Sequence, residues 1–510
     1  MDYKELIIRE IIKNRVKNRN DLAKIKRKAA KNHKIPCPDN ISLLKTYHEL
    51  TKKKKIKKSP LLEFLLITRP IRSLSGIVNI SVLTKPYPCP GKCLYCPQEV
   101  NIPKSYVSGE PAVERAKKLH YDPYLQTKLR IEMLENEGHP TDKIELRIVG
   151  GTWSFYPKKY QEWFVKRCFD ACNKRKNKTL KEAQTINEKA KHRIVGLSIE
   201  TRPDFINEKE ITHLRDLGAT MVELGVQTIY NDILDINLRG HKVKETISAT
   251  KLLKDAGFKV LYQIMPNLPG SNIKKDEAMF KELFKNQDFQ PDLLKIYPCA
   301  LLKEAPLYKL WKKKKYKPYT EKQLINLIKT IKKKIPSYIR IQRISRDIPS
   351  SRIIAGPAKI SNIRQILKNQ NLHCKCIRCR EVRDNYKTKE KLYLFKKEYK
   401  ASKGKEIFLS FENKNRTKLH SLLRLRKTSE NKAIIREVHT FGQQIPISER
   451  QSSISPQHHG LGKKLIKEAE RITKKELNLK KISVIAAVGA RNYFKKSGYK
   501  LENTYMVKIL

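Results

Sequence analysis

Apolar positions in the middle of the chain form short runs that alternate with amphipathic helical segments. Between residues 71 and 344, β-rich runs of four to seven residues recur with helical spacing between them. This rhythm predicts βα units around a parallel sheet or partial barrel, whose active sites gather at the carboxyl ends of the strands. The runs lie at 144–149, 193–199, 221–225, 260–265 and 293–296, with an earlier strand expected near 78–82.

The two ends of the chain have different patterns. Near the N-terminus, apolar residues recur at helical spacing between lysines and arginines, which predicts basic helices. These apolar residues are Leu6, Ile7, Ile11, Ile12 and Val16. Toward the C-terminus, strand-like runs precede one long helix and further strands, which predicts a separate α+β domain. Its expected elements are strands at 407–411, 420–425, 433–438, 482–487 and 506–510 and a helix at 460–477.

The chain is strongly basic, with 110 Lys and Arg against 51 Asp and Glu and a net charge of +59. Because phosphate neutralisation drives nucleic-acid binding, this excess predicts a polyanionic partner. Residues 1–60 stand out with 19 basic against 6 acidic side chains, although a composition rich in Lys, Ile and Asn makes part of the excess background. The basic helices are therefore either an RNA-binding arm or a solvated face.

The sequence shows no pattern of a membrane span or a signal peptide. No stretch approaches the roughly 20 apolar residues of a span, and no apolar core follows the first residues. Six of the ten cysteines lie in two tight triplets, which is typical of metal ligation in a reducing compartment. The sequence predicts a cytoplasmic protein with no membrane anchor.

The first triplet, Cys89, Cys93 and Cys96, has the spacing C-x3-C-x2-C and is followed by a proline. This spacing is typical of a 4Fe-4S cluster that cleaves S-adenosylmethionine, because three thiolates leave one iron open to the methionine moiety. Such a cluster supplies a 5'-deoxyadenosyl radical. The alternative is a structural zinc site, but such sites usually add a second C-x2-C pair or histidine, and no second pair lies nearby.

Glycine and polar residues follow several of the predicted strands. Two glycines close the run at 144–149, where a turn without side chains lets backbone carbonyls approach the amino group of S-adenosylmethionine. Each of these residues either lines the cofactor site or has a structural role as a turn, a cap or an ion pair with the next helix. The candidates are Gly150, Gly151, Thr152, Glu200, Glu223 and Gln227.

The second triplet, Cys374, Cys376 and Cys379, offers three soft ligands between basic segments. Zinc is the metal expected there, and its fourth ligand must come from elsewhere. His373 is adjacent but sterically awkward, and Cys299 or a distant histidine is an equal candidate. Free thiols are the alternative.

A glycine-rich turn, Gln457-His-His-Gly-Leu-Gly462, opens the predicted helix of the last domain. Its backbone N–H groups and the helix dipole point at an anion, for which a pyrophosphate is the natural ligand. A strand precedes the turn and the segment 488–499 follows it, an order that resembles the GNAT acetyltransferase fold, which binds acetyl-coenzyme A. Outside that context, a plain helix N-cap fits the turn equally well.

Both motifs in one basic chain resemble the catalytic subunit of Elongator, a tRNA wobble-uridine modification enzyme. The resemblance extends from about residue 71 to residue 510. It includes Pro103-Lys-Ser-Tyr106, Gly109-Glu-Pro111, Tyr121-Asp-Pro-Tyr-Leu-Gln126, Gly138-His-Pro-Thr-Asp-Lys143, Tyr160-Gln-Glu-Trp163, Glu200-Thr-Arg-Pro-Asp204, Glu223-Leu-Gly-Val-Gln227, Leu294-Lys-Ile-Tyr-Pro298, Cys376-Ile-Arg-Cys-Arg-Glu381, Arg436-Glu-Val-His439 and Tyr505-Met-Val-Lys508.

This resemblance implies an α/β fold in four parts. They are basic tRNA-binding helices at 1–70, a partial (βα) barrel of radical S-adenosylmethionine (radical SAM) type at 71–350, a small zinc-binding linker at 351–390 and a GNAT-like α+β domain at 391–510. The mechanism needs the radical and the acetyl group to meet, so the two large domains are expected to face each other across one cleft near Cys374 and Cys379.

The resemblance also implies the reaction. In the family, the deoxyadenosyl radical abstracts hydrogen from the methyl group of acetyl-coenzyme A, the carbon radical adds to carbon 5 of the wobble uridine, and thioester hydrolysis leaves 5-carboxymethyluridine. The implied partner is tRNA, with a 4Fe-4S cluster, S-adenosylmethionine, acetyl-coenzyme A and zinc. Whether the protein forms a homodimer, and whether it needs accessory Elongator subunits, the resemblance leaves open.

Further site residues follow only from the resemblance. It implies Lys143 and Tyr493 as catalytic residues at acetyl-coenzyme A, and Lys295 as a contact on the S-adenosylmethionine side. The remaining acetyl-coenzyme A contacts that it implies are Glu437, Val438, His439, Thr440, Gln457, Gly460, Leu461, Gly462, Lys463 and Phe494.

The chain departs from the family pattern at three places. Gln98 and Glu99 follow the third cysteine, where the family commonly has two glycines. Phe494 follows Tyr493 where the family usually has a second tyrosine, which weakens any role for that second hydroxyl. Cys299 replaces a hydroxyl residue with no effect that the sequence reveals.

Two other functions compete with this interpretation. A protein lysine acetyltransferase with a structural iron–sulfur cluster needs only the last domain, and it leaves the radical chemistry of the first triplet unused. A non-catalytic tRNA-binding scaffold needs only the basic N-terminus, and it leaves both motifs unused.

Overall fold

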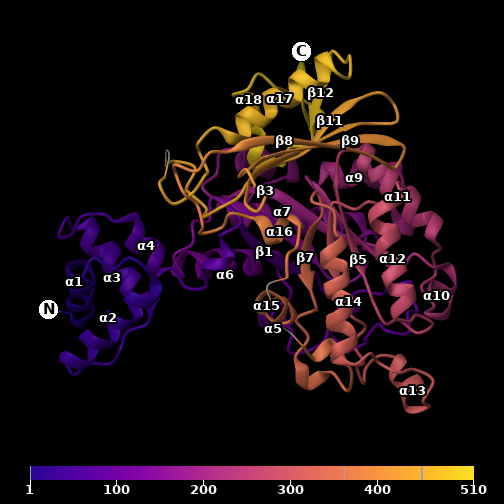
Figure 1. Ribbon diagram of the computed structural model, residues 1–510, viewed down its shortest axis with the longest axis horizontal. Helices are drawn as coiled ribbons and strands as arrows, with labels where there is room; N and C mark the ends of the chain where they lie inside the picture. The colour runs from indigo at the N-terminus through magenta and orange to yellow at the C-terminus, as the bar shows by residue number, and fades with distance from the viewer. Residues whose placement is uncertain (1, 361, 371, 450–451) are drawn as a thin grey trace.

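A computed structural model describes residues 2–360, 362–370, 372–449 and 452–510. A lobe of N-terminal helices stands to one side of a larger body that holds two seven-stranded sheets (Figure 1). Within these residues, no helix combines the length and the apolarity that crossing a bilayer requires.

The N-terminal lobe has its own apolar core. Ile7, Ile8 and Ile11 of its first helix are buried in one cluster with Leu43 and Tyr47 of its third helix. Most of the lysines and arginines between these positions remain at the surface, so the predicted basic helices are confirmed. The helices are α1 (Tyr3–Lys13), α2 (Arg19–Asn32), α3 (Asn40–Lys52) and α4 (Pro60–Leu66).

The first sheet is a parallel half-barrel whose strands follow chain order, which confirms the predicted fold class. In its first strand, Val78, Ile80 and Val82 are buried toward the helices, while Ser81 faces the interior of the half-barrel. The strands are β1 (Val78–Leu83), β2 (Lys143–Val149), β3 (Arg193–Thr201), β4 (Met221–Gln227), β5 (Lys259–Ile264), β6 (Leu293–Ile296) and β7 (Arg340–Ile344).

Helices cover the outer face of the half-barrel, as α9, α11, α12 and α14 do at the right of Figure 1. The helices that follow its first six strands in the chain are α5 (Pro111–Lys118), α6 (Pro123–Asn136), α7 (Lys158–Asn173), α8 (Leu180–Asn187), α9 (Glu208–Asp216), α10 (Asn231–Ile236), α11 (Val243–Asp255), α12 (Ile273–Lys285), α13 (Leu307–Lys312) and α14 (Glu321–Lys334). Two shorter helices, α15 (Ile363–Asn369) and α16 (Ile377–Arg380), follow β7.

The second sheet forms the C-terminal part of the body. Its strand order is β13-β14-β12-β11-β10-β9-β8, and the pairing is antiparallel except between β11 and β12. The strands are β8 (Tyr393–Ala401), β9 (Gly404–Glu412), β10 (Leu419–Lys427), β11 (Ala433–Thr440), β12 (Lys481–Val484), β13 (Lys500–Glu502) and β14 (Tyr505–Ile509). The helices α17 (Leu461–Lys475) and α18 (Arg491–Lys495) complete this part.

The strand prediction for this domain was incomplete. It missed β8, an edge strand in which exposed and half-buried residues alternate and lysines interrupt the apolar pattern, and the short exposed strand β13. The predicted strand 482–487 was too long, because β12 ends at Val484 and residues 485–487 leave the sheet.

The second sheet lies against the amino ends of the parallel strands. Arg436 of β11 is buried and donates from Nη1 to Oδ1 of Asp292 at 3.0 Å and from Nη2 to the carbonyl of Phe258 at 2.7 Å. Arg424 of β10 donates to the carbonyl of Tyr338 at 2.7 Å. These three partners precede β6, β5 and β7, so buried charge joins the two sheets directly.

Candidate functional site

The carboxyl ends of the parallel strands surround a cavity of about 290 Å³, termed the first cavity. Cys96 lines it from the loop after β1, and three predicted site residues line it from the strands. These three are Glu200, Gln227 and Lys295. The half-barrel therefore brings them to the same place as the first cysteine triplet.

Gly91 of the cysteine loop lies beside two of its thiols. A side chain at Gly91 would place its Cβ 3.5 Å from Sγ of Cys93, 3.7 Å from Sγ of Cys89 and 2.7 Å from Nη1 of Arg202, so glycine leaves room next to these sulfurs. Cysteine thiolates are the donor set of an iron–sulfur cluster. The donor types present fit that group.

Arg239, which no local sequence pattern indicates as a site residue, contacts the cysteine loop. It donates from Nη1 to Sγ of Cys93 at 3.5 Å and from Nη2 to the carbonyl of Gly225 at 2.6 Å. Burial opposes ionisation of the Cys93 thiol, but Arg239, with Tyr95 and Arg202, outweighs it and lowers the pKa of Cys93. The thiolate is the form that ligates a metal. Sequence reasoning missed Arg239 because 146 residues separate it from Cys93.

Glu99, one of the two residues that replace the family's glycines, tethers the same loop. Its carboxylate accepts from the backbone N–H of Ser108 at 3.0 Å and from Nη2 of Arg352 at 2.9 Å. Arg352 also donates to Glu304 at 3.0 Å. Glu99, which departs from the family pattern, thus connects the cysteine loop to the segment that follows β7, the last strand of the half-barrel.

The glycine turn after β2 lies close to the cysteine loop. A side chain at Gly150 would clash with Thr84, whose Oγ1 lies 2.0 Å from the Cβ position, so only glycine fits. A side chain at Gly151 would meet only the hydroxyl of Tyr156, at 3.8 Å. Oγ1 of Thr152 lies 3.5 Å from Sγ of Cys89.

Two predicted carboxylates share one lysine inside the half-barrel. Nζ of Lys295 donates to Glu200 at 2.9 Å and also pairs with Glu223. Glu200 lines the first cavity and accepts from the hydroxyl of Tyr106 at 3.1 Å, whereas Glu223 is fully buried behind it. The structure therefore places Glu200 on the wall of the first cavity. Glu223 does not line that cavity, and its charge is paired with Lys295.

A larger cavity of about 500 Å³, termed the second cavity, lies between the two sheets. It is lined by all the residues that the resemblance implies for acetyl-coenzyme A. These are Lys143, Glu437, Val438, His439, Thr440, Gln457, Gly460, Leu461, Gly462, Lys463, Tyr493 and Phe494. Its wall on the half-barrel side includes Lys143, Arg193 and Lys259, the first residues of β2, β3 and β5.

The side-chain amide of Gln457 forms several hydrogen bonds in this wall. Its Oε1 accepts from Nζ of Lys143 at 2.9 Å and from the backbone N–H of Ile445 at 3.0 Å, and its Nε2 donates to the carbonyls of Gly76 and Thr440 at 2.9 and 3.1 Å. The Gln457 amide therefore positions Lys143 and its neighbours. Burial lowers the pKa of Lys143 to about 8.

Other polar groups of the second cavity are also held in place. The Glu437 carboxylate accepts from Arg424 at 2.8 Å and from Lys259 at 3.2 Å, and Nε2 of His439 lies 2.7 Å from the carbonyl of Ser75. Although burial opposes its ionisation, Lys259 and Arg424 lower the pKa of Glu437 to about 2. The wall thus carries a fixed negative charge.

The start of α17 opens into the second cavity. Gly460 precedes the helix with a positive φ of 79°, and the first N–H groups of a helix have no partner within it. A side chain at Gly462 would place its Cβ 2.8 Å from the hydroxyl of Tyr493, so this position needs glycine. Phe494 packs against Tyr499 in the core, which explains why a phenyl ring serves there without a hydroxyl.

The two cavities lie at opposite ends of β2. Lys143 begins the strand and Val149 ends it, and at about 3.3 Å per residue they are roughly 20 Å apart. Glu145 lines the second cavity and Arg147 the first, and Nε of Arg147 donates to Oε1 of Glu145 at 2.7 Å. One ion pair of the half-barrel interior, which sequence reasoning missed, thus stands between the cavities.

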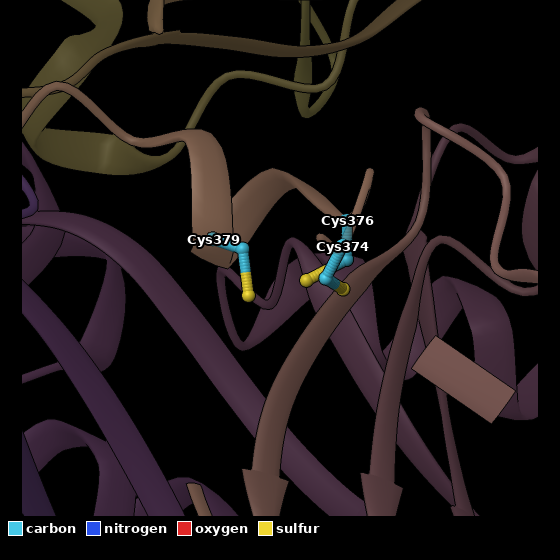
Figure 2. Close-up of side chains that lie close together, drawn as sticks. All are labelled: Cys374, Cys376 and Cys379. Carbon is cyan, nitrogen blue, oxygen red and sulfur yellow. The ribbon is translucent and has the colours of Figure 1, made fainter. Parts of the chain in front are cut away.

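The second cysteine triplet forms a compact group at the junction of the two sheets. The sulfurs of Cys374, Cys376 and Cys379 all lie within 4.8 Å of one another, and Figure 2 shows the three side chains close together. A tetrahedral zinc site with Zn–S bonds of about 2.3 Å needs sulfurs this close. In the described part of the chain, neither His373 nor Cys299 belongs to the group.

Positive side chains and the second sheet surround this group. Lys332 donates from Nζ to Sγ of Cys379 at 3.2 Å, and hydrogen bonds from Cys374 and Cys376 strongly lower the pKa of Cys379. Glu381, two residues after the triplet, forms a β-bridge with Leu419 of β10. The residues fit a thiolate-bound metal that joins the linker to the second sheet.

Comparison with known proteins agrees with this arrangement. A family model for the Radical SAM superfamily matches residues 87–283, and one for the Radical SAM C-terminal domain matches residues 291–371. A tRNA uridine(34) acetyltransferase of Methanocaldococcus infernus is 44% identical over 99% of this chain and 98% of its own length. The human Elongator complex protein 3 is 37% identical over 87% of this chain and 86% of its own length.

The chain belongs to the Elongator protein 3 family. A solved structure of the archaeal Methanocaldococcus infernus Elp3, with an N-terminal deletion (1–46), covers 86% of this chain and all of its own, with a TM-score of 0.75 and 44% identity. The predicted family is therefore confirmed, and membership of the radical SAM superfamily implies a 4Fe-4S cluster and S-adenosylmethionine. In this member of the Elongator protein 3 family, the superfamily match includes Cys89, Cys93, Cys96, Glu200 and Gln227.

Proposed function

We propose that the protein forms 5-carboxymethyluridine at the wobble position of tRNA anticodons, with acetyl-coenzyme A as the carbon donor. One observation carries this proposal: the residues implied for acetyl-coenzyme A line one cavity, and an ion pair of β2 has one member in that cavity and the other in the cavity beside the cysteine loop. The relatives named tRNA uridine(34) acetyltransferase support the same substrate class.

The second cavity suits acetyl-coenzyme A because it combines anion-binding and apolar groups. The first N–H groups of α17 and the positive charges of Lys143 and Lys463 favour a pyrophosphate at that end. The cavity extends along β11, where a strand edge can hold the pantetheine arm, and Tyr493 lines it beside the start of α17. Burial raises the pKa of Tyr493 to about 12, which keeps its hydroxyl protonated as a hydrogen-bond donor.

The first cavity suits the radical step. When bound, the cluster with S-adenosylmethionine supplies a 5'-deoxyadenosyl radical that can take hydrogen from a methyl group. In the proposal, Thr152, Glu200 and Gln227 orient S-adenosylmethionine, together with the glycine turn and Lys295. Carbon 5 of uracil lies in an electron-poor double bond, so it accepts a carbon radical readily. An ordinary acetyltransferase would instead transfer the acetyl group to an amine.

The remaining parts have supporting roles in the proposal. Residues 1–70 hold tRNA through their positive charge, residues 71–350 and 391–510 carry the two cavities, and the linker 351–390 binds a structural zinc ion through Cys374, Cys376 and Cys379.

An anaerobic reaction tests the function. Reconstituted protein is incubated with tRNA, S-adenosylmethionine, a reductant and acetyl-coenzyme A, and the digested RNA is analysed by mass spectrometry. We expect 5-carboxymethyluridine and 5'-deoxyadenosine, both lost in Cys89→Ala and retained in Cys37→Ala, which changes an exposed cysteine outside both triplets. Lysine acetylation without 5'-deoxyadenosine would instead support an acetyltransferase, and tRNA binding without turnover a scaffold.

A further inference from the structure

Three arginines gather beside the first cavity, near the point where the N-terminal lobe joins the half-barrel. Arg72 ends the short turn η1 (Pro70–Arg72) that follows the lobe, while Arg115 lies on α5 and Arg130 on α6. Arg115 also lines the first cavity. These three residues are termed the arginine cluster.

Within the ranges that the structure describes, one carboxylate forms an ion pair with this cluster. Glu137, which follows α6, forms an ion pair with Arg72. Arg130 precedes Glu137 by seven residues, which is about two helical turns, so both lie on the same side of α6. Among the residues that the structure describes, Arg115 and Arg130 have no hydrogen-bond acceptor and no ion-pair partner.

This arrangement carries an electrostatic cost. Burial and the charge of Arg72 lower the pKa of Arg115, and burial with repulsion from Arg115 and Arg72 lowers the pKa of Arg130 to about 10. A partly buried guanidinium has five N–H groups that normally find carboxylate or carbonyl acceptors. Arg115 and Arg130 are half-buried, and their guanidinium nitrogens stay open to solvent, so both groups are free to bind an anion from outside the protein.

Other arginines on the wall of the first cavity differ in this respect. Arg346 donates to the carbonyl of Ser105 at 2.6 Å and to Glu110 at 3.2 Å, and Arg343 pairs with Asp347. Their charges already have acceptors within the protein. The unmatched positive charge beside the cavity therefore belongs to the arginine cluster.

We propose that the arginine cluster binds a backbone phosphate of the RNA, next to the nucleotide that enters the first cavity; this inference rests on the proposed function. Guanidinium groups match phosphate oxygens with paired hydrogen bonds. A base that is splayed out of a loop into a pocket leaves its phosphate at the rim. The cluster also lies between the basic lobe and the cavity, so it extends the positive surface toward the reaction site.

Salt-dependent binding tests the proposal. The probe is a synthetic anticodon stem-loop RNA, titrated against full-length reconstituted protein at several salt concentrations. We expect Arg115→Ala and Arg130→Ala each to raise Kd roughly tenfold and to reduce the salt slope by about 1. Arg130→Lys keeps the charge and should restore most of the slope. The matched control is Arg471→Ala, which changes an exposed arginine of α17 that is paired with Glu468 and should leave both quantities unchanged.

Binding of S-adenosylmethionine to the same variants identifies the anion. Unchanged S-adenosylmethionine affinity together with weaker RNA binding supports the proposal. Loss of S-adenosylmethionine affinity with unchanged RNA affinity overturns it, as does a wild-type salt slope in both alanine variants. These binding experiments measure no reaction product, so they test the arginine cluster separately from the proposed reaction. If the enzyme makes no 5-carboxymethyluridine but the salt slope still depends on Arg115 and Arg130, the proposed reaction is refuted and the phosphate site is not.

Discussion

Arg147 and Glu145 form an ion pair on β2 with one member in each cavity, and Nε of Arg147 lies 2.7 Å from Oε1 of Glu145. Burial opposes the charge on Glu145, yet Arg147 and Lys259 lower its pKa to about 2, so the pair is ionised. In the proposed function, an acetyl group of the second cavity has to reach the first cavity, and this pair spans the two along β2. The Arg147 cation is therefore the member of the pair that we propose as the partner of the thioester carbonyl.

Replacement of Arg147 tests this placement. In Arg147→Met, the cation that can hold the carbonyl is lost, and we expect the ratio of 5-carboxymethyluridine to 5'-deoxyadenosine to fall at least ~tenfold. The affinity for acetyl-coenzyme A should stay near the wild-type value because the pyrophosphate end is untouched. With trideuterated acetyl groups, deuterium in 5'-deoxyadenosine reports direct contact with the methyl group. An unchanged ratio and unchanged deuterium transfer would exclude this role.

Lys143 should make acetyl-coenzyme A binding depend on pH. Burial lowers its pKa to about 8, so it is charged below that pH and attracts the anionic coenzyme, and it becomes neutral above it. We expect the Kd of acetyl-coenzyme A to rise as pH increases through about 8. Lys143→Arg stays charged at these pH values and should abolish the rise, whereas Lys143→Met should bind weakly throughout. A rise that persists in Lys143→Arg would assign the titration to another group.

The two cysteine triplets should hold different metals independently. Cys379→Ser removes a ligand from the compact group of three sulfurs, and we expect bound zinc to fall while iron stays at the wild-type level. Cys93→Ser should have the opposite effect. Elemental analysis of the reconstituted proteins measures both metals, with Cys37→Ser as the control because its thiol is exposed and lies outside both groups. Loss of both metals in either variant would contradict two separate sites.

The sequence predicted six of the seven strands of the half-barrel, because apolar residues recur in short runs there. It missed β7, in which arginine and glutamine interrupt the isoleucines. Local spacing also identified both cysteine triplets and the turn before α17. It could not predict which ends of the strands the second sheet covers, since that depends on contacts such as Arg436 with Asp292, 144 residues away. The positions of the two cavities at opposite ends of β2 follow from this long-range packing.

Several residues that support the site could not be predicted either, because their contacts are with residues distant in the sequence. Arg147 and Arg115 lie in ordinary strand and helical patterns, and Arg239 lies in the loop between α10 and α11. Their partners or their lack of partners become visible only in the fold. Glu99 had been noted only as a departure from the family, and its contact with Arg352 gives it a structural role. Charged side chains that act through distant partners leave no local signal.

The buried pair of Arg436 and Asp292 should be important for the stability of the body. Both side chains are fully buried. Asp292→Asn leaves Glu406 as the carboxylate still paired with Arg436, so buried positive charge is left in excess, and we expect the free energy of unfolding to fall by about 3–5 kcal/mol. Denaturant unfolding monitored by fluorescence measures the change. Lys481→Met is the matched control, because it breaks an ion pair with Glu502 in which both side chains are about half exposed, and it should cost less than ~1 kcal/mol. If both variants lost the same free energy of unfolding, burial would not determine how much an ion pair contributes to stability.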